Sequence, residues 1–212
     1  HTANSSGIIA NRWKKCYEGI GRCNTHLNRL PAAVVADDRR VQMEGEAKFL
    51  RALYYYMLVT YYNGVPLILE EPVYAHGSLP RASREEVVRA ILDDLNDIID
   101  RELLDWQWTK AADQGRATRG AAMALKARLL LFEASKLVNP SNDAAKWQAA
   151  ADAAKADDAD GLALQLDERI VPIAPVGIRG PIARMDRRAV MADMVADLQQ
   201  KGDEYWLTDA VP

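Results

Sequence analysis

The feature that most constrains the fold of this chain is a helical pattern that occurs twice. Gly45–Met57 aligns with Gly120–Phe132, and both begin Gly-x-Ala-x-x-Leu-basic-Ala before a run of large apolar residues. Small residues one turn apart let a neighbouring helix approach closely, as in the stacked helical hairpins of tetratricopeptide repeats. We therefore predict an all-α, tetratricopeptide-like fold with long loops. The close contacts are expected at four alanines: Ala47, Ala52, Ala122 and Ala127.

Apolar residues at three- and four-residue spacing predict five helices in the first three quarters of the chain. The first carries an apolar stripe from Trp13 to Leu30 and stops at Pro31. The second is expected at about 39–62, and the third begins at a capping box formed by Ser83 and Glu86. The fourth and fifth are expected at about 118–137 and 144–156. Val65–Leu69 is expected to cross between helical layers in extended form, because Pro66 prevents the helix from continuing.

The composition changes near residue 157, which divides the chain into a helical scaffold over 1–156 and a tail over 157–212. The tail has a stretch rich in Pro and Gly, followed by a helical pattern at Asp186–Gln200 that resembles the third predicted helix. This similarity has two explanations, a degenerate repeat or a segment whose true neighbours are missing.

Charge and length exclude several classes of protein. The chain has 212 residues, with 27 Lys and Arg against 30 Asp and Glu, so no general basic field attracts nucleic acid. No apolar run reaches the roughly 18 residues of a membrane span, and the first residues lack the features of a signal peptide. Because the chain starts at His1 without Met, we expect a trimmed or mature form. Cys16 and Cys23 would lie about 10 Å apart on one helix, too far for a disulfide, and are predicted to be core residues.

No pattern of catalytic or metal-binding residues is present. The three histidines form no zinc motif, and His26 is expected at the edge of a helix. Glu44 and Glu46 point away from each other on a helix, which argues against an acid/base pair, so we interpret them as charges that complement a helix N-terminus. We expect no enzyme activity, no cofactor and no metal.

Aromatic residues in loops are the strongest indication of binding. Trp106, Gln107 and Trp108 lie in one polar loop and Tyr74 in another. On extended chain, Trp106 and Trp108 would share a face and form an apolar platform for a sugar ring, with Gln107 supplying hydrogen bonds. The alternative is that this loop folds over the helices and buries both rings. These four residues are our candidate ligand-binding residues.

Two motifs of the chain resemble the SusD/RagB family. One is Gly45–Tyr56 running into Tyr61–Ile68, and the other is Gly115–Ala122 followed by Ala127-Arg128-Leu129. Two further patterns are similar to the flanking signatures of that family: the spacing of Trp13, Tyr17, Ile20 and Asn24, and the motif Trp147-x-x-Ala-Ala. The resemblance covers roughly residues 10–156. Family members are much longer, and their lipid-bearing N-terminal cysteine has no counterpart here, since Cys16 lies within a predicted helix.

The resemblance implies a non-enzymatic lipoprotein on the surface of the outer membrane. Such a protein captures oligosaccharides, or in some branches peptides, and delivers them to a SusC-like, TonB-dependent transporter. The alternative is a helical-repeat scaffold or SusD-like protein that binds a peptide or protein. Aromatic loops favour the first function, whereas a continuous exposed groove without an aromatic platform would favour the second. The sequence does not identify the glycan, its linkage or the transporter.

Overall fold

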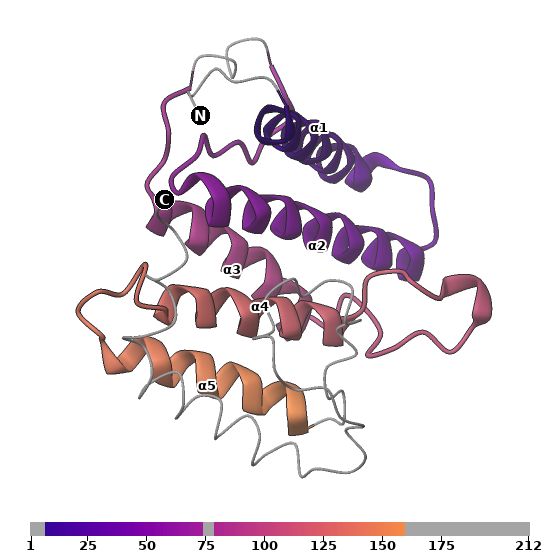
Figure 1. Ribbon diagram of the computed structural model, residues 1–212. Coiled ribbons are helices and arrows are strands. Elements are labelled where there is room, and N and C mark those ends of the chain that lie inside the picture. Colours follow the sequence, from indigo (N-terminus) through magenta and orange to yellow (C-terminus); the bar gives the residue numbers. More distant parts are fainter. Residues whose placement is uncertain (1–6, 74–78, 160–212) are drawn as a thin grey trace. The chain divides into compact units, whose positions relative to one another are not determined.

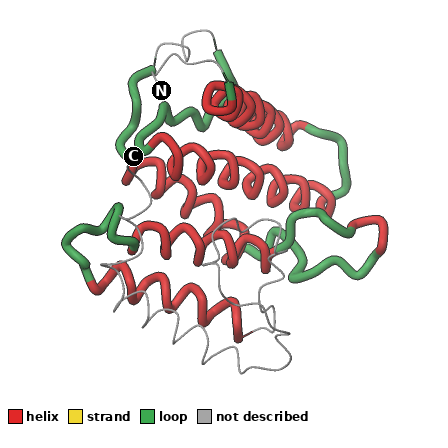
Figure 2. Tube along the Cα trace, viewed as in Figure 1, coloured by secondary structure: helices red, strands yellow, loops and turns green. Residues whose placement is uncertain are grey.

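The computed structural model describes residues 7–73 and 79–159 and contains five α-helices in those ranges (Figure 1). They are α1 (Ile8–Arg29), α2 (Asp37–Tyr62), α3 (Arg84–Asp100), α4 (Arg119–Ala134) and α5 (Ala144–Ala159), with short 3-10 turns η1 at Leu30–Ala32 and η3 at Ala111–Asp113. The described residues contain no β-strand, and Figure 2 shows only helices joined by loops. The all-α prediction is confirmed.

The chain divides into two compact units, residues 1–129 and 130–212. The helix α4 begins in the first unit and ends in the second. The division expected from composition at residue 157 stays a prediction. The helical pattern at Asp186–Gln200 lies outside the described residues.

A local signal explains where α3 begins, and a more distant arginine caps the end of α2. The capping box predicted for α3 is present: the Ser83 hydroxyl accepts from the Glu86 amide at 3.2 Å, and the Glu86 carboxylate accepts from the Ser83 amide at 2.7 Å. At the end of α2, the Arg81 guanidinium donates to the carbonyls of Tyr62 and Gly64, each at 3.0 Å. A cation at a helix C-terminus also complements the helix dipole.

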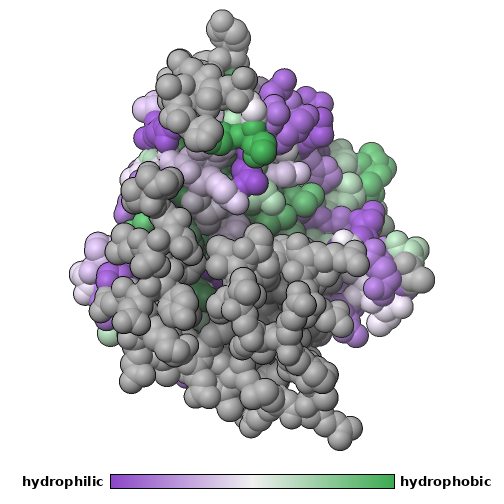
Figure 3. All heavy atoms as spheres, viewed as in Figure 1, coloured by the Kyte–Doolittle hydropathy of each residue, from purple (hydrophilic) through white to green (hydrophobic). Residues whose placement is uncertain are grey.

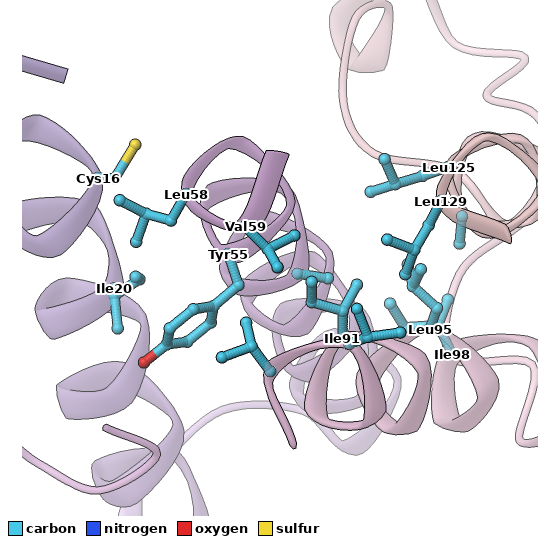
Figure 4. Close-up of a cluster of buried hydrophobic side chains, with 14 of the residues drawn as sticks. Cys16, Ile20, Tyr55, Leu58, Val59, Ile91, Leu95, Ile98, Leu125 and Leu129 are labelled. Atoms are coloured by element: carbon cyan, nitrogen blue, oxygen red, sulfur yellow. The ribbon is translucent and has the colours of Figure 1, made fainter. Parts of the chain in front are cut away.

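The core of the first unit forms where α2 packs against α1 on one side and α3 on the other (Figure 1). Figure 4 shows side chains from α1, α2 and α3 meeting Leu125 and Leu129 of α4 in one cluster. Its fully buried members include Ile20, Tyr55, Leu58, Val59, Ile91, Leu95, Ile98 and Leu129. Cys16 and Cys23 are buried and free, as predicted, and burial raises the pKa of Cys23 to about 11.

Small residues lie where the helices approach most closely. Ala47, Ala52 and Ala122 are buried, whereas Ala127 is half-buried, so three of the four predicted contact alanines are enclosed. A Cβ atom added at Gly19 of α1 would lie 2.3 Å from the Tyr54 ring of α2. Only glycine leaves room for this ring, which sets the separation of the two helices at that point.

Val65–Leu69 leaves the helical conformation, as Pro66 predicts, and side chains satisfy its backbone. The Tyr17 hydroxyl donates to the Pro66 carbonyl at 2.7 Å, and the Asn24 amide donates to the Ile68 carbonyl at 2.8 Å. The Tyr55 hydroxyl bonds both the carbonyl and the amide of Ile68, at 2.9 and 2.8 Å. Residues of α1 and α2 therefore take the place of a neighbouring strand.

A buried polar group, which we call the inner cluster, joins α1, α2 and α3. It consists of Asn24, Arg51 and Asp94. The Arg51 guanidinium binds the Asp94 carboxylate at 2.7 and 2.8 Å and donates to the Asn24 side-chain oxygen at 2.9 Å. Burial opposes the charge on Arg51, but the bonds to Asp94 outweigh burial and raise the pKa of Arg51 above its ordinary value. A further Arg51 contact, to the Leu69 carbonyl at 3.3 Å, ties the cluster to the extended segment.

Candidate functional site

The loop between α3 and α4, residues 101–118, carries three of the four predicted site residues. The first residues of the loop pack against α2, where Leu103 and Leu104 are buried. A Cβ atom at Gly45 of α2 would lie 2.9 Å from Leu103 Cβ and 2.8 Å from Leu104 Cγ. The first glycine of the repeated pattern therefore admits the start of this loop.

Two arginines hold the second half of the loop. The Arg116 guanidinium binds both oxygens of Glu46 on α2, at 2.7 and 2.6 Å, and this carboxylate raises the pKa of Arg116. The Arg119 guanidinium binds the Glu102 carboxylate, and the Arg119 amide donates to the Asp105 carbonyl at 2.9 Å. A positive φ of 85° at Gly115 allows the turn that precedes Arg116.

Trp108 belongs to the edge of the core. Its half-buried ring packs against the hydrophobic cluster, and its indole nitrogen donates to the Ala117 carbonyl at 2.9 Å. The Trp108 carbonyl accepts from the Gln114 side chain at 3.0 Å. Trp108 therefore links the first half of the loop to its second half, through Gln114 and Ala117.

Trp106 and Gln107 lie further from the core. Trp106 is half-buried and is not among the residues packed against the core, and the Arg119 guanidinium lies 5.6 Å from its ring centroid. Gln107 is exposed. The chain bends at Trp106 and Gln107, so the extended conformation on which the shared platform depended is not formed. Tyr74, the fourth predicted residue, lies outside the described residues.

Glu44 and Glu46 have a different role from the one predicted. The helix α2 begins at Asp37, and the acidic residues of its first turn are Asp37 and Asp38. Glu46 holds Arg116, as described above, and Glu44 binds Lys48 at 2.9 Å and Arg101 at 2.8 Å. Both carboxylates therefore link α2 to other elements and lie too far along the helix to complement its N-terminus.

An open groove of about 710 Å³ lies along α1 and was not anticipated from the sequence. Its lining includes Tyr17, Arg22 and His26 from α1, Leu30 after it, Met43 from α2 and Pro72. His26 is half-buried here, at the edge of its helix as expected. The sequence signal for such a groove was a row of polar and small residues at helical spacing, from Glu18 to Arg29, beside the apolar stripe of α1.

Among the described residues, no three His, Cys, Asp or Glu side chains come together in a way that would hold a metal ion. None of the helices in residues 7–73 and 79–159 has the length and apolar character that crossing a bilayer requires.

A family model described as "Starch-binding associating with outer membrane" matches residues 1–131. The chain belongs to the SusD-like family. This match spans the helices of the first unit and the loop with Trp106. No curated protein matches the chain significantly.

Solved structures of SusD-like proteins share the fold. One from Bacteroides fragilis NCTC 9343 is 26% identical, with a TM-score of 0.62 over 73% of this chain and 28% of its own. A laminarin-binding SusD-like protein is 30% identical, with a TM-score of 0.58, and the match covers 67% of this chain and 28% of that protein. Surface glycan-binding protein A from Bacteroides uniformis is 27% identical, with a TM-score of 0.60, and the match covers 73% of this chain and 32% of that protein. The matched part of this SusD-like chain therefore corresponds to less than a third of each relative.

Proposed function

We propose that this SusD-like chain is part of a non-enzymatic surface protein that captures oligosaccharides and delivers them to a TonB-dependent transporter of the outer membrane. The observation that carries the proposal is the family match over residues 1–131, which includes the aromatic loop. Two of the similar structures are described as laminarin-binding and surface glycan-binding proteins. In this proposal a lipid anchor outside residues 1–212 holds the protein at the cell surface.

The loop with Trp106 supplies the ligand contact in this proposal. Its two arginine anchors and the Trp108 bond fix the backbone, so little conformational entropy is lost when a ligand binds. Trp106 contributes an aromatic ring for the C–H face of a sugar, and the exposed Gln107 amide contributes directional hydrogen bonds. Trp108 supports the loop from beneath, and Tyr74 adds a second aromatic contact.

Calorimetric titration of the chain with a panel of oligosaccharides, and with peptides of equal length, tests the proposal. We expect an oligosaccharide to bind, and Trp106→Ala to weaken its binding by about 1–3 kcal/mol, the scale known for aromatic stacking on nucleic-acid bases. The thermal stability of this variant should change little.

Trp108→Ala is the matched control on the same loop. Because Trp108 packs against the core, its loss should lower the free energy of unfolding by about 2–3 kcal/mol, below the range for a fully buried tryptophan. Unchanged sugar affinity in Trp106→Ala would move the binding site away from this loop. Binding of peptides without binding of any sugar would replace glycan capture with the alternative, peptide recognition.

A further inference from the structure

Charge is distributed unevenly between the helices of the first unit. The helix α1 contains five Lys and Arg residues but only one acidic residue, Glu18, although the whole chain has a formal net charge of −3. The helix α3 has the opposite balance, with six Asp and Glu and two Arg. Figure 3 shows hydrophilic residues gathered over the visible side of α1. The groove along α1 therefore lies on the basic helix of an acidic protein.

Among the described residues, two charged ones other than Arg22 line the groove, Glu18 and Arg29, and both already have partners. Glu18 accepts from Lys15 at 2.9 Å and lies 4.0 Å from Lys14. Lys15 above all, with Lys14 and Arg22, lowers the pKa of Glu18 from its ordinary value. At the other end, the Arg29 guanidinium binds Glu71 at 2.6 Å. Glu18 therefore shares its charge among three cations and Glu71 is bound by Arg29, and neither carboxylate forms an ion pair with Arg22.

Arg22 differs from these groups. It lines the groove, is exposed, and forms no hydrogen bond or ion pair within the part of the chain that the structure describes. Thr25 and His26, on the next turn of α1, add a hydroxyl and an imidazole to the same wall. A guanidinium binds a carboxylate through two parallel hydrogen bonds, a geometry that lysine does not offer.

The remaining lining is suited to a sugar. Tyr17 offers an aromatic ring, while Leu30, Met43 and Pro72 offer apolar surface. The volume of about 710 Å³ is within the usual range of ligand pockets. An anionic membrane would bind most readily to a convex basic surface, whereas Arg22 lies in a concave one.

We propose that the groove along α1 binds an acidic oligosaccharide, with Arg22 pairing with a carboxylate of the sugar. The inference rests on the proposed function, glycan capture, and adds the chemical class of glycan and a second contact site. The loop with Trp106 and the groove are separate sites in the first unit.

Calorimetric titration of the full 212-residue chain with two hexasaccharides tests the inference. One probe is hexagalacturonate, which carries six carboxylates, and the other is maltohexaose, which is neutral. We expect hexagalacturonate to bind about ten-fold more tightly at low salt, and this advantage to shrink as salt screens the charges. Arg22→Gln should remove most of the advantage. Arg89→Gln, which removes an exposed cation of α3 outside the groove, should leave it unchanged.

The outcomes separate the inference from the proposed function. Equal affinity for the two sugars, with no effect of Arg22→Gln, overturns the acidic-glycan inference while glycan capture stands. Failure of every sugar in both panels to bind overturns glycan capture itself. If Arg22 is instead required for binding to phosphatidylglycerol vesicles and not to hexagalacturonate, the groove is a membrane contact and the inference is wrong. Thermal melts of both variants check that each remains folded.

Discussion

Two charged clusters join α2 to α3, and they differ mainly in exposure. The inner cluster has an ion pair between Arg51 and Asp94, whose side chains are 11% and 8% exposed. The second, which we call the outer cluster, consists of Glu44, Lys48, Asp97 and Arg101, with side chains between 17% and 51% exposed. Nitrogen–oxygen distances are similar, 2.7 Å for Arg51–Asp94 and 2.8 Å for Arg101–Glu44. Both clusters pair an arginine with a carboxylate at a similar distance, so the main difference between them is burial.

Burial changes what the loss of one partner costs. In the outer cluster, water replaces a lost partner, and exposed ion pairs contribute only about 0–1 kcal/mol. In the inner cluster, the remaining charge has little access to water, and a broken buried pair costs about 3–5 kcal/mol. The inner cluster therefore fixes the relative positions of three helices, whereas the outer cluster adds a weaker link that depends on salt.

The largest predicted effect is that of Asp94→Ala. It leaves the Arg51 guanidinium buried without its carboxylate, and we expect the free energy of unfolding to fall by about 3–5 kcal/mol. Urea denaturation measures this change. A loss below about 1 kcal/mol would show that water reaches Arg51 and that the two clusters do not differ in burial.

Replacing both charges of the inner pair sharpens the comparison. Arg51→Met combined with Asp94→Leu removes both charges and keeps the space filled, so we expect the double variant to be more stable than Asp94→Ala. It should still be less stable than the wild type, because Asn24 and the Leu69 carbonyl lose the bonds that Arg51 donates. Urea denaturation of the three proteins under one set of conditions gives this order. A double variant no more stable than Asp94→Ala would show that packing, and not the unpaired charge, dominates.

A smaller effect is expected for Glu44→Gln in the outer cluster. The substitution keeps the shape of the side chain and removes the charge that binds Lys48 and Arg101. We expect a loss of less than about 1 kcal/mol, which decreases further in high salt. Thermal melts at low and high salt measure it. Asp93→Asn, at an exposed position of α3, serves as the control for the loss of one negative charge.

The sequence predicted the helices well because their signals are local. The capping box at Ser83 and the proline at position 66 act within a few residues, and both predictions are confirmed. The inner cluster depends on α1, α2 and α3 coming together, so no local pattern specifies its partners. A signal was nevertheless present, because Asn24, Arg51 and Asp94 are polar residues on the apolar faces of their helices.

The candidate site was less predictable for the same reason. Whether Trp106 and Trp108 share a face depends on the bend between them and on the packing of Trp108 against the core. The roles of Glu44 and Glu46 depend on Arg101 and Arg116, which lie far away in sequence. These contacts arise only once the loop between α3 and α4 returns to α2.

The pH dependence of the outer cluster gives the smallest effect. Burial alone would raise the pKa of Glu44, but the bonds to Arg101 and Lys48 outweigh it and hold that pKa below its ordinary value. A carboxyl with a lowered pKa in the folded state stabilises the protein at neutral pH, and this stabilisation is lost as pH falls through the folded pKa. Protonated Glu44 resembles glutamine, so the difference in melting temperature between wild type and Glu44→Gln should shrink as pH falls from 7 to 3. A difference that persists at pH 3 would mean that glutamine is disfavoured at this position for its shape, and that the charge of Glu44 contributes nothing to the link between α2 and α3.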